Sequence, residues 1–241
     1  MLEIADAMIR ILDLAAACKM DLEGHIAAKM RFNEMLEGVR LAVPGDLRDE
    51  CRVLYGGSVK ADNAAELNAK PEQIAAHQRL VDQAVKDFGA QHYDHYEFLL
   101  SISDQLGGIG LEHHRSSENT GAPGFFTDWA KSAGDRALLP HEYTHSWNGK
   151  FMRPADELTA NHNVPTQNTL LWVYEGQTEY WGDVLAARSG LHSKGVALAT
   201  LASIAAFYDN QPGRQWRALQ DTNNHNLLGY RVPGQYPSWM R

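Results

Sequence analysis

The sequence has little cysteine, no cluster of basic residues and no hydrophobic run long enough to cross a membrane. Its two cysteines, Cys18 and Cys51, stand in separate segments, so neither a disulfide framework nor a cysteine metal site is indicated. The net charge of -8, without a basic cluster, disfavours binding to nucleic acid or to an anionic membrane. The chain starts with the acidic residues Glu3 and Asp6 rather than a basic leader, so we expect no secretory signal and a cytoplasmic location.

The composition permits a folded core but leaves the domain organisation open. At 241 residues, 44% of them hydrophobic, the chain can form one large domain or two small ones. No internal repeat or low-complexity tract divides it, and nothing in the sequence indicates an oligomeric state.

The feature that points to chemistry is the sequence His-Glu-Tyr-Thr-His at residues 141–145. On a helix, residues four apart share a face, so His141 and His145 can bind one metal ion while Glu142 projects beside it. Zinc prefers such nitrogen and oxygen ligands, and a catalytic site leaves one position to water, from which Glu142 is predicted to take a proton as general base. The same motif can occur by chance on a soluble helix, but the neighbouring apolar residues and the acidic helix that follows favour a metal site.

We predict that the third ligand is Glu175, in a helix expected over residues 168–188. Bulky residues should bury this helix against the first one, with Glu175 pointing into the gap; they are Trp172, Val173, Tyr180 and Trp181. Glu179, one turn later, is then placed to hold a ligand histidine by a hydrogen bond.

The runs at residues 107–118, 141–156 and 171–182 together resemble the glycyl aminopeptidase family of metallopeptidases, which is related to the aminopeptidase N type. The resemblance extends over about residues 72–241. It implies an α+β, predominantly helical fold, namely part of a thermolysin-like zinc peptidase catalytic domain. It also implies the gluzincin site: Zn2+ bound by His141, His145 and Glu175, with Glu142 as the base.

The resemblance also implies a substrate, a peptide with a free N-terminus and a small first residue. The strand containing Gly110 and Glu112 would pair with the substrate backbone, and Glu112 would contact the free amino group. The alternative for Glu112 is a solvated carboxylate on an edge strand.

The full-length relatives carry further helices and a PDZ domain after the catalytic segment, whereas this chain ends at Arg241. Their oxyanion-stabilising tyrosine comes from the region just beyond this end, and Tyr236 is a weak substitute candidate. An alternative to the active enzyme is therefore a catalytically impaired protein that binds zinc or peptides.

Residues 1–37 are expected to form a helical pair that resembles the closing helices of MazG-type nucleotide pyrophosphohydrolases. Glu3 and Asp6 match an acidic pair that helps to bind magnesium in that family. The partner acidic helix is missing before Met1, so we interpret the two carboxylates as the solvated start of a helix.

Residues 38–71 are expected to form a βα fragment, in which residues 51–67 resemble triosephosphate isomerase. A strand at Val53–Tyr55 and a loop at Gly56–Ser58 would precede the start of a helix at residues 62–67. One such unit cannot close a barrel. The remaining alternative is a phosphate-ligand binder that uses Gly56–Ser58, which requires a helix N-terminus with free amides after the loop.

The peptidase-like part, residues 72–241, is expected to mix helices and strands. The patterns predict helices over residues 72–88, 137–148, 168–188 and 193–207, strands over 96–102 and 110–114, a loop over 119–128, and irregular structure after 209.

Overall fold

The computed structural model describes residues 58–106, 108–161, 163–216 and 218. The predicted helical pair at residues 1–37, the strand at Val53–Tyr55 and the oxyanion candidate Tyr236 lie outside these residues. The described part is a small mixed sheet covered by helices, which confirms the general mixture of helices and strands but leaves the thermolysin-like detail as a proposal.

The sheet has four strands in the order β1-β2-β4-β3, with bounds Ser58–Ala61 for β1, Glu97–Ile102 for β2, Ser116–Gly121 for β4 and Gly110–Glu112 for β3. Strands β1, β2 and β4 are parallel, whereas β3 is antiparallel to β4 and forms an edge. Alternate residues of β2 are buried, as expected for a strand with one face on a core.

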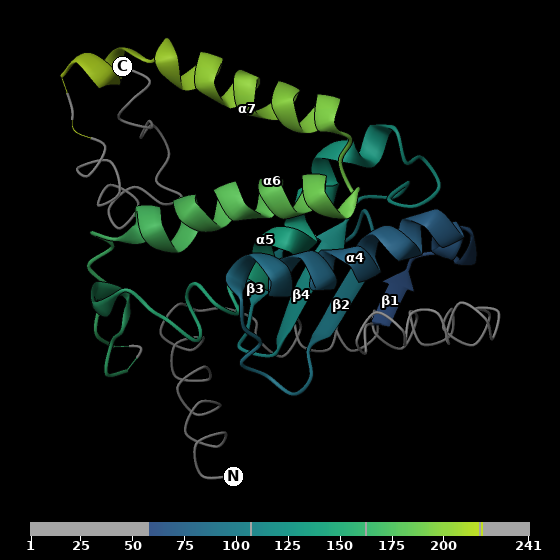
Figure 1. Ribbon diagram of the computed structural model, residues 1–241, viewed down its shortest axis with the longest axis horizontal. Coiled ribbons are helices and arrows are strands. Elements are labelled where there is room, and N and C mark those ends of the chain that lie inside the picture. The colour runs from purple at the N-terminus through teal and green to yellow at the C-terminus, as the bar shows by residue number, and fades with distance from the viewer. Residues whose placement is uncertain (1–57, 107, 162, 217, 219–241) are drawn as a thin grey trace, which may run out of the picture.

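Among the described residues, four α-helices accompany the sheet: α4 (Pro71–Phe88), α5 (Leu138–Thr144), α6 (Thr178–Ser189) and α7 (Lys194–Asp209). Proline at the first position of α4 and left-handed glycines after α4 and α6, Gly89 and Gly190, fit the usual helix boundaries. Short 3-10 helices lie at Ala64–Leu67, Lys131–Ala137, Ala155–Glu157 and Pro212–Gln215. In Figure 1, α6 lies between α7 and the layer that contains α4 and α5.

The core is built around aromatic side chains that anchor α5 to the sheet. Tyr143 of α5 is fully buried, and its ring centroid lies 4.7 Å from that of Tyr96 and 5.1 Å from that of Phe98. Trp147, just after α5, packs on Tyr143 at 5.0 Å. Burial of these rings fixes α5 against the sheet, while His141 and His145 lie toward α6.

Several predicted elements are confirmed to within two residues at each end. They are the helices at 72–88 and 193–207 and the strand at 96–102, observed as α4, α7 and β2. The strand at 110–114 is shorter, and so is the helix at 137–148, which ends at Thr144 and continues as turns.

The predicted loop at residues 119–128 is wrong at its start, because residues 119–121 belong to β4. The buried Asn119 side-chain nitrogen donates to Leu99 O at 3.2 Å and to Ser117 Oγ at 3.0 Å, so the donor end of this polar side chain is satisfied inside the sheet. Hydrogen bonding of this kind offsets the cost of burying amide and hydroxyl groups.

The predicted phosphate loop is also wrong at Ser58, which belongs to β1. The next helical element is a single 3-10 turn, and its first amides are already engaged, since the Asn63 side chain accepts from Ala65 N at 3.1 Å. A phosphate site of the expected form is therefore not supported by the described part of this segment.

No helix in the described part of the chain combines the length and the apolar character that a membrane span requires.

We predict that Leu185→Ala in α6 lowers the free energy of unfolding by about 2–5 kcal/mol, because a fully buried leucine leaves a cavity. Leu198→Ala in α7 is the matched control, since Leu198 is 57% exposed and its truncation removes little buried surface. Urea denaturation followed by circular dichroism measures both. A smaller loss for Leu185→Ala than for Leu198→Ala would contradict the assigned packing of α6.

Candidate metal centre

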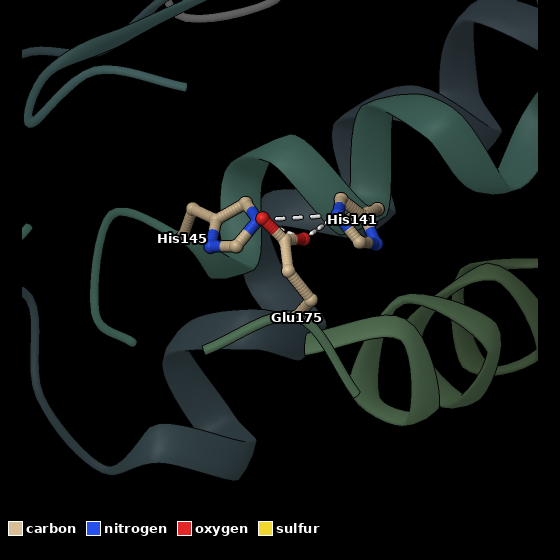
Figure 2. Close-up of side chains that lie close together, drawn as sticks. All are labelled: His141, His145 and Glu175. Atoms are coloured by element: carbon tan, nitrogen blue, oxygen red, sulfur yellow. Dashed lines mark hydrogen bonds and ion pairs between the residues drawn. The ribbon is translucent and has the colours of Figure 1, made fainter. Parts of the chain in front are cut away.

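Three side chains from two helical segments converge on one point (Figure 2). The Nε2 atoms of His141 and His145 lie 3.1 Å apart. Glu175 Oε2 lies 3.4 Å from His141 Nε2 and 3.3 Å from His145 Nε2. The structure thus brings together the three residues that the sequence analysis selected, and within the residues described they form a group able to hold a metal ion.

The arrangement follows from local structure. His141 lies one helical turn before His145, which directly follows the last residue of α5, so both rings project from one face. Glu175 lies in a short π-helix, Trp172–Gln177, that leads into α6. A π-helical turn is uncommon, occurs often at functional sites and changes the direction of the side chains that follow.

A glycine permits the close contact between the two helices. At Gly182 of α6, a Cβ atom would lie 3.1 Å from the backbone N and Cα of His141 and 3.2 Å from its Cβ. Contacts to backbone atoms cannot be relieved by a change of rotamer, so a larger residue would push α6 away from α5 and carry Glu175 and Glu179 with it.

The outer ring nitrogens of both histidines are held by hydrogen bonds. His141 Nδ1 donates to Glu179 Oε2 at 2.9 Å, and His145 Nδ1 donates to the Asn148 carbonyl oxygen at 3.0 Å. These bonds leave both Nε2 atoms facing the common point. The position predicted for Glu179 agrees with this geometry, whereas Asn148 was missed.

Asn148 also ties the two segments together. Its side-chain amide donates to Val173 O at 2.6 Å and to Thr178 Oγ1 at 3.0 Å. The only sequence signal for this role is the position of Asn148 three residues after His145, in the turn that leaves α5.

The electrostatics of the group favour a positive charge at its centre. Burial alone would lower the pKa of His141, but the carboxylates of Glu175, Glu179 and Glu142 raise it to about 10. Burial would raise the pKa of Glu175, but its contacts with both histidines lower it to about 2. Two imidazoles and one carboxylate are also a common set of ligands for catalytic zinc, so the donor atoms suit a cation at this position.

Glu142 is buried beside this group. Its side chain is 5% exposed, and its Oε2 atom has no hydrogen-bond partner among the residues that the structure describes. Burial raises its pKa to about 7, against the opposing charges of His141 and His145. A carboxyl group with this pKa can both accept and release a proton near neutral pH.

Gly110 on the edge strand β3 makes room for Glu142. A Cβ atom at residue 110 would lie 1.9 Å from Glu142 Oε1 and 2.8 Å from Leu138 Cδ1. Both Gly110 and Glu142 line an open cleft of about 430 Å³. Its other lining residues include Gly108, Ile109, Leu138, His141 and Glu179.

Glu112, two residues along β3, is held by protein donors rather than by solvent. Its Oε1 atom accepts from Tyr174 Oη at 2.6 Å and lies 3.1 Å from Lys150 Nζ. Burial would raise the pKa of Glu112, but the Tyr174 hydroxyl, its own backbone and Lys150 together lower it. The alternative of a solvated edge-strand carboxylate is therefore wrong, and Tyr174 and Lys150 are site residues that the sequence analysis missed.

Comparison with known proteins relates part of this chain to one sequence family. Residues 135–239 match the sequence profile of the family described as M61 glycyl aminopeptidase. This segment is related to the glycyl aminopeptidase family. The matched range includes His141, Glu142, His145 and Glu175.

The fold resembles the crystal structure of an aminopeptidase N family protein from Idiomarina loihiensis, with a TM-score of 0.59 and 20% sequence identity. The similarity covers 70% of this chain and 30% of that protein, so the chain spans less than a third of its length. No curated protein matches the chain.

We predict that Glu142→Gln raises the free energy of unfolding of the metal-free protein at about pH 8 by roughly 1–3 kcal/mol. The folded pKa of Glu142 is raised to about 7, so the folded state binds this proton more tightly than the unfolded state does. The stability contributed by the protonated form is complete below the unfolded pKa and is lost as the pH rises through about 7. The advantage of Glu142→Gln should therefore shrink toward about pH 4.

Thermal unfolding in the presence of a chelator, across this pH range, measures the difference. Asp82→Asn on the exposed side of α4 controls for the loss of one negative charge. A Glu142→Gln variant less stable than the parent at about pH 8 would contradict the assigned burial of Glu142.

Proposed function

We propose that this chain is a zinc-dependent aminopeptidase with a thermolysin-like arrangement of the catalytic residues. The observation that supports the proposal most strongly is the convergence of His141, His145 and Glu175 beside the buried carboxylate of Glu142. The four residues come from α5, its C-terminal turn and the π-helical turn, and the Glu142 carboxylate faces the cleft. The chain spans only part of the structural relative, so the proposed activity is argued from this local geometry.

The donor set fits zinc, because two imidazole nitrogens and one carboxylate oxygen already point at one another over distances of 3.1–3.4 Å. When bound, zinc polarises the substrate carbonyl and lowers the pKa of a water ligand to about 7. Glu175 has the lowered pKa that a ligand carboxylate needs to stay ionised.

Glu142 carries the proton. Its Oε2 atom, buried and without a partner in the described part of the molecule, is available to accept a proton from the attacking water. Because its pKa lies near 7, the same carboxyl group can then donate that proton to the amine nitrogen of the leaving peptide. Gly110 leaves the space that the carboxylate occupies in both states.

The bonds to Glu179 and Asn148 keep the ligand histidines in the required tautomer. With Nδ1–H donating outward, each ring keeps its Nε2 lone pair toward the common point. Glu179 also adds negative charge beside His141, which strengthens the imidazole as a donor.

The edge strand β3 supplies the substrate platform in this proposal. An edge strand offers unpaired backbone groups to an extended peptide, which can bind by strand addition. Gly110 and Glu112 are two residues apart and therefore share one face of β3. On that face Glu112 can accept a hydrogen bond from the free amino group of the substrate.

Our first functional prediction is that the purified chain binds about one zinc ion per molecule. His145→Ala should lose most of it, because one of three protein ligands is removed. His113→Ala, which changes an exposed histidine at the end of β3, is the matched control and should keep the metal. Elemental analysis of the three proteins decides; equal zinc content in all of them would exclude the site.

The second prediction concerns the base. Glu142→Gln should retain zinc yet lose nearly all hydrolysis of short peptides, by about 10²- to 10⁴-fold, because the amide cannot accept the proton. Turnover of glycyl peptides, measured beside metal content, separates loss of chemistry from loss of metal. A variant that keeps activity within a few-fold of the parent would remove Glu142 from this role.

The third prediction concerns the free amine. Acetylation of the substrate N-terminus and Glu112→Gln should each depress cleavage, and the two effects should not add, since both remove the same charge-assisted contact. The kcat/KM values of free and acetylated peptides with both proteins give the coupling. Equal cleavage of the two peptides by the parent protein would favour an endopeptidase instead.

A further inference from the structure

The carboxylate that the proposed function reserves for the substrate amine is already bound to an ammonium group of the protein. Lys150 Nζ lies 3.1 Å from Glu112 Oε1, and the two side chains are 20% and 19% exposed. Tyr174 Oη donates to the same oxygen at 2.6 Å. A lysine ammonium and a peptide N-terminus present the same chemical group, so both can satisfy this oxygen.

The backbone around Lys150 is fixed to the metal-binding segment. Lys150 N donates to the His145 carbonyl oxygen at 3.1 Å. The preceding residue, Gly149, has a φ of +132° and lies so close to the Tyr174 ring that a Cβ atom there would be 2.8 Å from it. The segment that leaves α5 therefore directs the Lys150 side chain toward Glu112 while its backbone stays close to the metal centre.

The two donors to Glu112 differ in how easily they can leave. The Tyr174 ring packs against the ring of His145, with centroids 4.9 Å apart. Tyr174 also immediately precedes Glu175 in the chain, so it is held close to the candidate metal ligands. Lys150 reaches Glu112 with an ammonium on a flexible four-carbon stem, which can swing into solvent without moving the backbone. Lys150 is therefore the donor that a ligand can displace, while Tyr174 stays in place and keeps the Glu112 carboxylate oriented.

We propose that Lys150 is a specificity-determining residue that occupies, in the free protein, the place on Glu112 taken by the substrate ammonium group. This inference rests on the proposed function, because it assumes that Glu112 receives the substrate amine. A peptide with a free amine binds to Glu112 only in molecules from which Lys150 has moved away. The apparent affinity of the peptide is therefore its intrinsic affinity multiplied by the fraction of such molecules. An acetylated peptide does not compete for Glu112 and is indifferent to Lys150.

Lys150→Met tests the proposal, because methionine keeps an unbranched apolar stem and removes the ammonium. We expect it to bind glycylglycinamide roughly three- to tenfold more tightly than the parent, the range expected when a partly buried ion pair no longer competes. Lys150→Arg, which keeps the cation, should bind at or below the parental affinity. Lys86→Met, which removes an exposed lysine of α4, controls for net charge and should leave the affinity unchanged.

Dissociation constants for glycylglycinamide and for its N-acetyl form give the readout; they are measured by NMR titration of the zinc-loaded full chain with Glu142→Gln in every variant, so that the probe is bound but not cleaved. The gain in Lys150→Met should be confined to the free amine and should vanish when Glu112→Gln is added. Unchanged or weaker binding by Lys150→Met, a gain shared by the acetylated probe, or no binding by any variant would overturn the proposal.

Failure of the proposed function has a separate signature. If the parent protein takes up no zinc or cleaves no peptide, the enzyme assignment fails whatever the titrations show. If it does both while Lys150→Met shows no selective gain for the free amine, only the role of Lys150 fails.

Discussion

The close packing of α6 on α5 is the contact on which the candidate site depends. Gly182 lets α6 approach the backbone of His141, and this approach brings Glu179 to His141 and Thr178 to within 3.4 Å of His145 Nδ1. On its other side α5 is anchored to the sheet by Tyr143, which packs among the core aromatics. The two histidines, which lie on α5 and at its C-terminal end, are therefore held in place between the sheet-anchored α5 and α6.

This packing concentrates negative charge around the two imidazoles. Glu175 and Glu179 contact them directly, and Glu142 is buried next to them. Burial opposes a positive charge on His141, but the carboxylates of Glu175, Glu179 and Glu142 raise its pKa to about 10. Glu142 is buried with a raised pKa, and its Oε2 atom has no hydrogen-bond partner among the described residues, an arrangement that costs stability. In the proposed mechanism this cost leaves the carboxylate ready to accept a proton.

The sequence was sufficient for the parts of the molecule that obey short-range rules. Helical periodicity located α4 and α7, and the four-residue spacing of His141 and His145 predicted a shared face. Glu175 could be selected because a bulky, helix-like segment surrounds it. Glu175 lies within residues 135–239, the range related to the glycyl aminopeptidase family.

What the sequence could not provide depends on contacts between distant segments. Strand β4 is polar, and it was missed because the sequence does not reveal the contact that its buried Asn119 nitrogen makes with the Leu99 carbonyl oxygen on β2. Asn148 and Lys150 carry no pattern of their own, since their contacts with Thr178 and Glu112 arise only when α5, α6 and β3 come together. The π-helical turn at Trp172–Gln177 was also missed, because the sequence pattern predicted one continuous helix over residues 168–188.

The most direct test of the central claim is the location of the metal itself. Anomalous diffraction at the zinc edge, from crystals of the metal-loaded chain, is predicted to give one peak about 2.0–2.2 Å from His141 Nε2, His145 Nε2 and a carboxylate oxygen of Glu175. No peak at this position, or a peak bound by a different set of residues, would contradict the account.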